Sequence, residues 1–200
     1  MSNSKRPALS VQYMTRIAVL AALSAVLFLT LEIPIFGSIY KLDFSNLPVL
    51  LAGFSMGPVP ALITLLLKDL IHMLFKGFST TVGIGDLADF IMTAAFVLPV
   101  CFLYHRNKSR KTALIGMGLG TVVMAAVAML VNAWILFPFY MNAFHMDLNA
   151  IAGALGVSSS GMMGLLLSTT LPFNLLKGVV ISLLTFLIYK PLSPMLHVKK

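Results

Sequence analysis

The segment 166–189 reads LLSTTLPFNLLKGVVISLLTFLIY and is long and apolar enough to cross a lipid bilayer. A membrane-spanning helix needs about 20 mostly apolar residues. The segment contains one charged residue, Lys177, and Asn174 stands three positions before it. Residues three apart share one face of a helix. The segment therefore predicts a membrane helix that carries an amide and an ammonium group on one face, and both groups need a polar partner there.

The composition of the whole chain supports a membrane protein. Of its 200 residues, 59% are hydrophobic and 10% are charged, and the mean hydropathy is +0.98. A soluble domain carries about 25% charged residues, so this chain lacks the polar surface of a water-soluble globule. We expect residues 1–200 to form a single membrane domain. Cys101 is the only cysteine, which excludes a disulfide within the chain.

Five segments reach the length of a membrane span, and a sixth is shorter. The shorter one, 46–56, is followed by Gly57 and Pro58, and glycine next to proline marks a break between helices. We interpret it as a short helix. The pattern predicts an all-α integral membrane protein, a compact bundle of six transmembrane helices with an outward-facing ligand pocket. The expected helices are approximately 16–36, 46–56, 58–76, 86–104, 112–138 and 166–189.

The distribution of charge predicts an orientation. Ten of the 14 basic residues fall on one side of the six-helix arrangement, and all six acids fall in the other half. Basic residues favour the cytoplasmic side, so we predict a multi-pass protein with both termini in the cytoplasm. Orientation then explains the net charge of +8 without a nucleic-acid partner. The long segments 37–45, 77–85 and 139–165 are expected to be irregular and to lie outside, where we expect a ligand to be handled.

Polar residues within the apolar segments are candidates for function, because they are costly at membrane depth. Asn132, Asn174 and Lys177 all fall in the outer half of their predicted helices. No acid occurs in 148–200 to neutralise Lys177 locally. A polar ligand is therefore the expected partner of these three residues.

Asp69 and His72 offer a second interpretation, a small intramembrane enzyme that uses them as a catalytic pair. They stand three residues apart on one predicted helical face, although a simple hydrogen bond would also explain them. The chain contains no P-loop, HExxH or GxSxG motif. The carboxylates also show no pattern typical of a metal site. These observations favour a protein that is not an enzyme and holds no metal.

Two stretches carry a resemblance to a known family: YKLDFSNLPVLLAGFSMGPVPALI (40–63) and FNLLKG (173–178). The chain resembles the substrate-binding S component of energy-coupling-factor (ECF) vitamin transporters, most closely the riboflavin-specific branch. The resemblance implies a bacterial cell-membrane protein with riboflavin as transported ligand and no cofactor; FMN and flavin analogues are further candidates. It also implies a membrane coupling subunit and two cytoplasmic ATPase subunits as partners. On physical grounds another vitamin, such as thiamin, a folate or a biotin-like compound, stays open.

The resemblance also implies site residues. In the riboflavin branch, polar residues of the last helices hold the isoalloxazine ring; here they match Asn132, Asn174 and Lys177. The loop after the first helix closes the pocket, and it matches 42–44 here, which are Leu42, Asp43 and Phe44. The chemistry fits independently, because an asparagine amide can pair with the alternating acceptors and donor of the flavin pyrimidine edge. A lysine ammonium can donate to a flavin carbonyl or ring nitrogen.

Small residues on the first helix suggest a docking surface. Ala18 and Ala22 stand four residues apart, as do Ala21 and Ala25, and small residues at this spacing let membrane helices approach closely. In the family, an Ala-x-x-x-Ala surface on this helix contacts the coupling subunit, and both pairs match it. Packing within the chain is the alternative explanation of these alanines.

Overall fold

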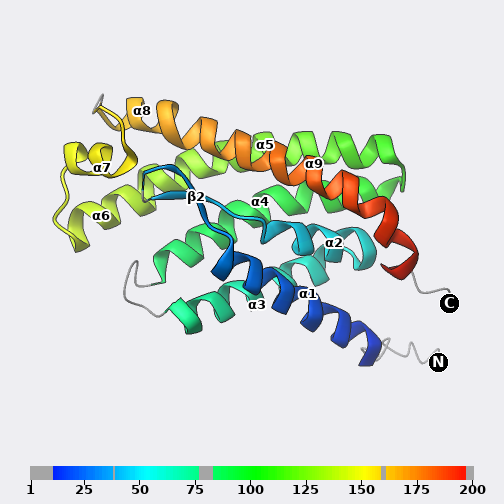
Figure 1. The fold of residues 1–200 in the computed structure, drawn as a ribbon. Coiled ribbons are helices and arrows are strands. Elements are labelled where there is room, and N and C mark those ends of the chain that lie inside the picture. The colour runs from blue at the N-terminus through cyan, green and yellow to red at the C-terminus, as the bar shows by residue number, and fades with distance from the viewer. Residues whose placement is uncertain (1–10, 38, 77–82, 159–160, 197–200) are drawn as a thin grey trace, which may run out of the picture.

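The computed structural model describes residues 11–37, 39–76, 83–158 and 161–196, with side chains up to residue 188, and almost all of these residues are helical (Figure 1). The elements in chain order are α1 (Val11–Thr30), β1 (Ile33–Phe36), β2 (Tyr40–Leu42), α2 (Asn46–Met56), α3 (Pro58–Lys76), α4 (Ile84–Arg106), α5 (Arg110–Val131), η1 (Asn132–Leu136), α6 (Phe137–Ala143), α7 (Leu148–Leu155), α8 (Gly161–Leu165), η2 (Leu166–Thr170) and α9 (Leu171–Leu196). The elements η1 and η2 are single π-helical turns.

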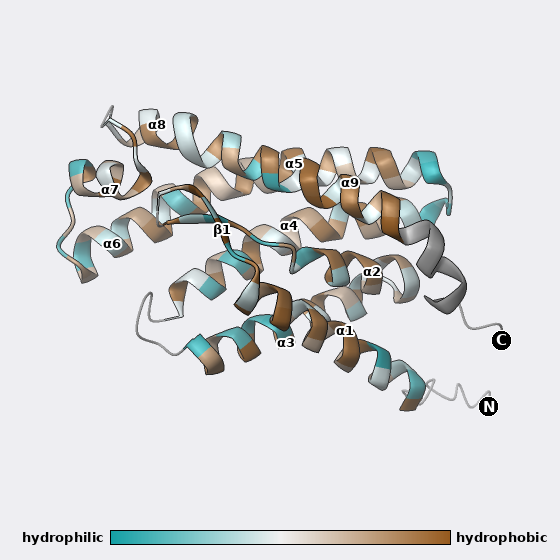
Figure 2. Ribbon diagram, viewed as in Figure 1, coloured by the Kyte–Doolittle hydropathy of each residue, from teal (hydrophilic) through white to brown (hydrophobic). Residues whose placement is uncertain are grey.

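Within the described residues, five helices are long and apolar enough to cross a membrane: Val11–Thr30, Pro58–Lys76, Ile84–Arg106, Arg110–Ala143 and Gly161–Ile188. The last two run continuously through η1 and η2. Helix α2 is also apolar but has only 11 residues. Figure 2 shows brown, hydrophobic residues along the long helices. Large apolar side chains such as Val122 and Leu183 are exposed on their outer faces, as expected where lipid replaces water.

The break between α2 and α3 follows from Gly57 and Pro58. The φ angle of Gly57 is +109°, a conformation that glycine adopts without a steric penalty. Its N–H donates to the carbonyl of Gly53 at 2.9 Å and closes α2. Pro58 then begins α3, a position where its missing N–H leaves no hydrogen bond unmade. Both helices have the bounds expected from the sequence, 46–56 and 58–76.

The expected first helix, 16–36, is wrong at its C-terminal end. Helix α1 ends at Thr30, and Ile33–Phe36 forms strand β1, which pairs antiparallel with β2. Proline lacks an N–H and disfavours helical backbone in the residue before it, so Pro34 prevents the helix from continuing through Ile33. The β-branched Ile33 and Ile35 favour a strand instead. Within the expected loop 37–45, Tyr40–Leu42 is consequently a strand of a β-hairpin.

The described residues of the segment 139–165 are also more ordered than expected. They contain the end of α6, the helix α7 and the whole of α8. Asp147 caps α7 by accepting a hydrogen bond from the N–H of Ala150 at 2.7 Å, a role that aspartate commonly plays at helix N-termini. Of the expected segment 77–85, residues 77–82 lie outside the described part of the chain.

Close packing of α5 against α4 and α9 forms the centre of the bundle, and it depends on glycine. A Cβ atom at Gly120 would lie 2.5 Å from the carbonyl oxygen of Phe96 on α4. One at Gly178 on α9 would lie 2.5 Å from Cγ2 of Thr121 on α5. Small residues let membrane helices approach this closely. The result is a rigid scaffold whose hairpin end, on the left in Figure 1, is capped by β1, β2, α6 and α7.

We predict that Gly120→Ala destabilises the protein by about 1–3 kcal/mol, because the added methyl group overpacks the α4–α5 interface. Gly118→Ala is the matched control, since Gly118 is exposed and a Cβ there would meet nothing within 4 Å. The control should be neutral or stabilising by about 0.5–1 kcal/mol, the helix propensity difference. Thermal unfolding of both variants in detergent measures this. Equal melting temperatures would contradict the close packing of α5 on α4.

Candidate ligand-binding site

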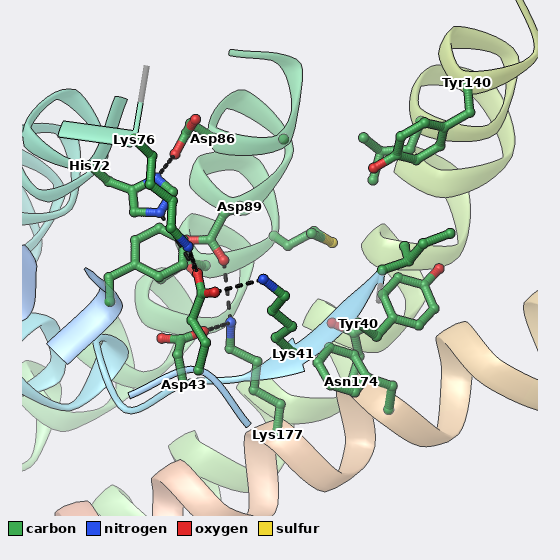
Figure 3. A pocket seen from close by; sticks show the side chains of 18 of the residues that line it. Tyr40, Lys41, Asp43, His72, Lys76, Asp86, Asp89, Tyr140, Asn174 and Lys177 are labelled. Carbon is green, nitrogen blue, oxygen red and sulfur yellow. Dashed lines mark hydrogen bonds and ion pairs between the residues drawn. The ribbon is translucent and has the colours of Figure 1, made fainter. Parts of the chain in front are cut away.

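A cavity of about 570 Å³ lies at the hairpin end of the bundle. Its walls come from the end of α1, the hairpin, the end of α3, the start of α4, and α5, η1, α6, α7 and α9. This volume falls within the range of about 300–1,000 Å³ that is typical of small-molecule sites. Figure 3 shows its two different ends: charged side chains gather on the left, around Asp89, and Tyr40 and Tyr140 lie on the right.

The aromatic end contains a stacked pair of rings, Tyr40 and Phe173. The rings of Tyr40 and Phe173 stack with centroids 5.0 Å apart and an interplanar angle of 13°. The Tyr40 hydroxyl donates to Oδ1 of Asn132 at 2.6 Å and lies 2.6 Å from Oγ1 of Thr170. Burial raises the pKa of the Tyr40 phenol, so the ring stays neutral. These bonds fix the ring orientation, and the apolar Met92 completes this end of the cavity.

The charged end is built on two buried lysines. Nζ of Lys177 on α9 lies 2.9 Å from Oδ2 of Asp43 and 3.3 Å from Oδ1 of Asp89. Nζ of Lys68 on α3 lies 2.5 Å from Oδ2 of Asp89 and 2.9 Å from Oδ1 of Asp69. Lys68 is fully buried and Lys177 is 6% exposed. A buried charge is tolerated only with partners of opposite sign, and each lysine has two.

Asp43 also organises the chain that follows the hairpin. Its Oδ1 accepts hydrogen bonds from the N–H of Ser45, at 2.9 Å, and from the Ser45 hydroxyl. Its Oδ2 faces Lys177. One carboxylate therefore fixes the turn that leads into α2 and ties that turn to α9.

A second set of charged groups lies at the mouth of the cavity, and we call it the mouth cluster: Glu32, Lys41, His72, Lys76 and Asp86. Glu32 accepts a hydrogen bond from Lys41, 2.7 Å from Oε2, and another from Lys76 at Oε1. Nδ1 of His72 lies 2.5 Å from Oδ1 of Asp86. Burial raises the pKa of Glu32, but the hydrogen bonds from the two lysines outweigh it and the net direction is downward. Glu32 is thus an anion held by two cations.

The expected ligand-binding residues divide into two groups. Asp43, Asn174 and Lys177 line the cavity. Nδ2 of Asn174 donates to the carbonyl of Thr170 at 2.8 Å. Asn174 lies on the same helix as Lys177, and Figure 3 shows both side chains at the cavity.

The other three expected residues lie behind the walls. Asn132 accepts from Tyr40 and donates to the carbonyl of Ala128 at 2.8 Å, so both ends of its amide are engaged within the chain. The side chain of Leu42, the last residue of β2, is buried in an apolar cluster with Phe137 and Phe173. Phe44 packs against the central core. Direct contact of these three residues with a ligand stays a prediction. In the structure they pack behind the residues that line the cavity and hold them in place.

The structure brings in residues that the sequence did not single out for the site. Asp89 and Lys68 complete the buried ion network, and Tyr40 supplies the aromatic wall. An acid inside an apolar helix is by default a candidate site residue, so Asp89 could have been found from the sequence. The acids that neutralise Lys177 are 134 and 88 residues away along the chain, which is why a search of 148–200 found none.

The Asp69–His72 pair expected for an enzyme is not formed. His72 pairs with Asp86 and stacks on Phe28, with ring centroids 3.8 Å apart. Asp69 instead faces Lys68. Within the described residues, no three histidine, cysteine or acidic side chains converge as a metal site.

The four alanines of α1 do not share one environment. Ala18 and Ala22 are exposed, whereas Ala21 and Ala25 are each 1% exposed and pack inside the chain. Only the first pair is on a surface that another subunit could reach in this structure.

The chain is similar to proteins of known class over nearly its whole length. The family model described as "ECF transporter, substrate-specific component" matches residues 12–189. The riboflavin transporter RibU of Staphylococcus aureus (strain TCH60) is 34% identical over 192 residues, which cover 94% of this chain and 95% of that protein. The riboflavin transporter FmnP of Bacillus subtilis (strain 168) is 27% identical over 183 residues, covering 90% and 92%.

The fold is similar to a solved structure as well. The S component of a bacterial ECF transporter matches with a TM-score of 0.73 and 32% sequence identity, and the match covers 92% of this chain and 96% of that one. Sequence and fold therefore agree on one family.

We predict that Asp89→Asn destabilises the protein by about 3–5 kcal/mol, because it removes a carboxylate shared by two buried lysines. Asp147→Asn is the matched control, since asparagine caps a helix as well as aspartate does. Adding Lys68→Met to Asp89→Asn should restore part of the loss, because the uncompensated lysine is removed. Unfolding in detergent measures all three variants. Strictly additive effects of Lys68→Met and Asp89→Asn would show that the two residues do not interact.

Proposed function

We propose, because this chain belongs to the family of substrate-specific components of ECF transporters, that its cavity captures riboflavin for ATP-driven uptake. The similar proteins from Staphylococcus aureus and Bacillus subtilis are both riboflavin transporters. One observation of the structure carries the proposal: the stacked rings of Tyr40 and Phe173 lie beside Asn174 and Lys177 in one cavity.

The polar groups of α9 suit the edge of a flavin ring. Nδ2 of Asn174 is used by the carbonyl of Thr170, which leaves Oδ1 to accept from the ring N–H of the pyrimidine edge. An ammonium group has three donors. Lys177 directs donors to Asp43 and Asp89 and keeps one for a ring carbonyl. The two residues together offer the donor and acceptor that this edge requires.

The rest of the flavin fits the two ends of the cavity. The flat isoalloxazine would pack along the Tyr40–Phe173 wall, since aromatic rings favour parallel, offset arrangements. The ribityl hydroxyls would face the mouth cluster and Asp43, because the opposite end is lined by apolar and aromatic side chains such as Met92. Riboflavin carries no net charge, and the charged groups around the cavity are already paired with one another.

Transport requires partners. The sequence contains no P-loop, so we propose that the energy comes from a membrane coupling subunit and two cytoplasmic ATPases. The exposed Ala18 and Ala22 are the proposed contact with the coupling subunit. We further propose that the cavity opens to the outside and that both termini are cytoplasmic, since the basic α4–α5 connection lies at the end opposite the hairpin (Figure 1). Impermeant labelling of a cysteine placed at Lys108 tests this orientation.

Asn174→Leu should weaken riboflavin binding about tenfold or more, since leaving a buried hydrogen-bonding group of the ligand unpaired costs about 1–3 kcal/mol. Asn142→Leu is the control, because Asn142 is exposed and outside the cavity lining. Calorimetric titration of purified protein with riboflavin, thiamin, a folate and biotin gives the affinities. Tighter binding of any other vitamin would refute riboflavin as the substrate, and an unchanged affinity in folded Asn174→Leu protein would refute the role of Asn174.

Ala22→Leu should leave riboflavin affinity unchanged and reduce uptake, because the added bulk faces outward from α1 and separates helices that approach through small residues. Val19→Leu, at an exposed position that already carries a larger side chain, is the control. Co-purification with the coupling subunit and riboflavin uptake by cells are the measurements. Normal assembly of the Ala22→Leu variant would exclude this face as the docking site.

A further inference from the structure

Glu32 sits in an arrangement suited to binding an anion. Lys41 of β2 and Lys76 at the end of α3 both donate to its carboxylate. Nε2 of His72 lies 3.9 Å from Oε1 of Glu32, and among the described residues this buried nitrogen has no hydrogen-bond partner. His72 is 9% exposed. Two ammonium groups, Lys41 from β2 and Lys76 from α3, thus converge on one carboxylate at the mouth of the cavity, with the His72 ring beside them.

The same donors would suit a phosphate group. Lysine is a common phosphate ligand, and charge-assisted hydrogen bonds of this kind are strong. In this chain, however, the position is filled by a carboxylate of the protein itself. Formal charges in the mouth cluster cancel when His72 is neutral: Glu32 and Asp86 carry two negative charges, and Lys41 and Lys76 carry two positive ones.

A phosphorylated ligand would upset this balance. A phosphate monoester carries a charge of about −1.5 to −2 at pH 7. If the ribityl end of a flavin points to the mouth, its phosphate would have to displace Glu32 from the two lysines and remain close to two carboxylates. The uncharged hydroxyl end of riboflavin does not need to displace Glu32, and the two carboxylates do not repel it. The difference depends on Glu32, because among the described residues its carboxylate accepts from both Lys41 and Lys76.

We infer that Glu32 is a specificity-determining residue that makes this site select riboflavin over its phosphate ester FMN by acting as an internal substitute for the phosphate. The inference rests on the proposed function, and it adds the basis of discrimination between two flavins that share the same ring. Removing the negative charge of Glu32 converts the mouth cluster into an open cationic site.

The test is the ratio of the FMN dissociation constant to the riboflavin dissociation constant, measured by titration of the purified full chain. Both flavins share their ring contacts, so the ratio of the two dissociation constants reports only the contacts at the mouth of the cavity. In the unmodified protein FMN should bind at least tenfold more weakly. Glu32→Gln should lower the ratio about tenfold, the effect of one or two charge-assisted hydrogen bonds. Asp147→Asn makes the same change of net charge outside the cavity lining and should leave the ratio unchanged.

Lys76→Gln provides a second, opposite test that does not depend on the folding of the Glu32 variant. It removes a cation from the mouth, so the ratio should rise. Equal affinity of the unmodified protein for both flavins would overturn the inference. So would parallel losses of both affinities in Glu32→Gln, which indicate a purely structural role. Failure of the unmodified protein to bind either flavin would instead refute the proposed function.

Discussion

Two lysine ammonium groups are buried within the apolar helices, and the placement of three helices and of the turn after the hairpin follows from the need to neutralise them. Lys68 on α3 and Lys177 on α9 share Asp89 on α4, and Lys177 also binds Asp43 after the hairpin. An unpaired charge in this environment would be very costly. These elements must therefore meet at one depth. The network acts as a constraint on how the helices pack, because buried ion pairs seldom add much net stability.

The same network prepares the cavity for a ligand. Asp43 fixes the turn into α2 and reaches across to Lys177, so the hairpin is tied to α9. The hairpin also supplies Tyr40, whose ring stacks on Phe173 of α9. One short strand thus contributes an aromatic wall, and the residue that follows it contributes a charge contact. The positions of Lys177 and of the hairpin are coupled for this reason.

Charge compensation extends over the whole site. Five of the six acids of the chain lie in or beside the cavity, and each faces a basic side chain. They are Glu32, Asp43, Asp69, Asp86 and Asp89. The site as a whole therefore suits a polar but uncharged ligand, which agrees with a vitamin such as riboflavin. Lysine donors lie at two places in the cavity: on Lys177, and in the mouth cluster, where the carboxylate of Glu32 occupies them.

The sequence by itself determined the apolar, helical character of the chain and the break at Gly57, because hydrophobicity over a span and glycine–proline punctuation are local properties. Pro34 indicates that α1 ends before it, but the apolar residues on both sides of Pro34 favoured a helix that continued to residue 36. The family resemblance placed Asp43 and Lys177 in one site. Only the tertiary structure decided that Asp89 neutralises Lys177 from 88 residues away. Which carboxylate meets which ammonium depends on how the helices pack, and that packing is not encoded in any single segment.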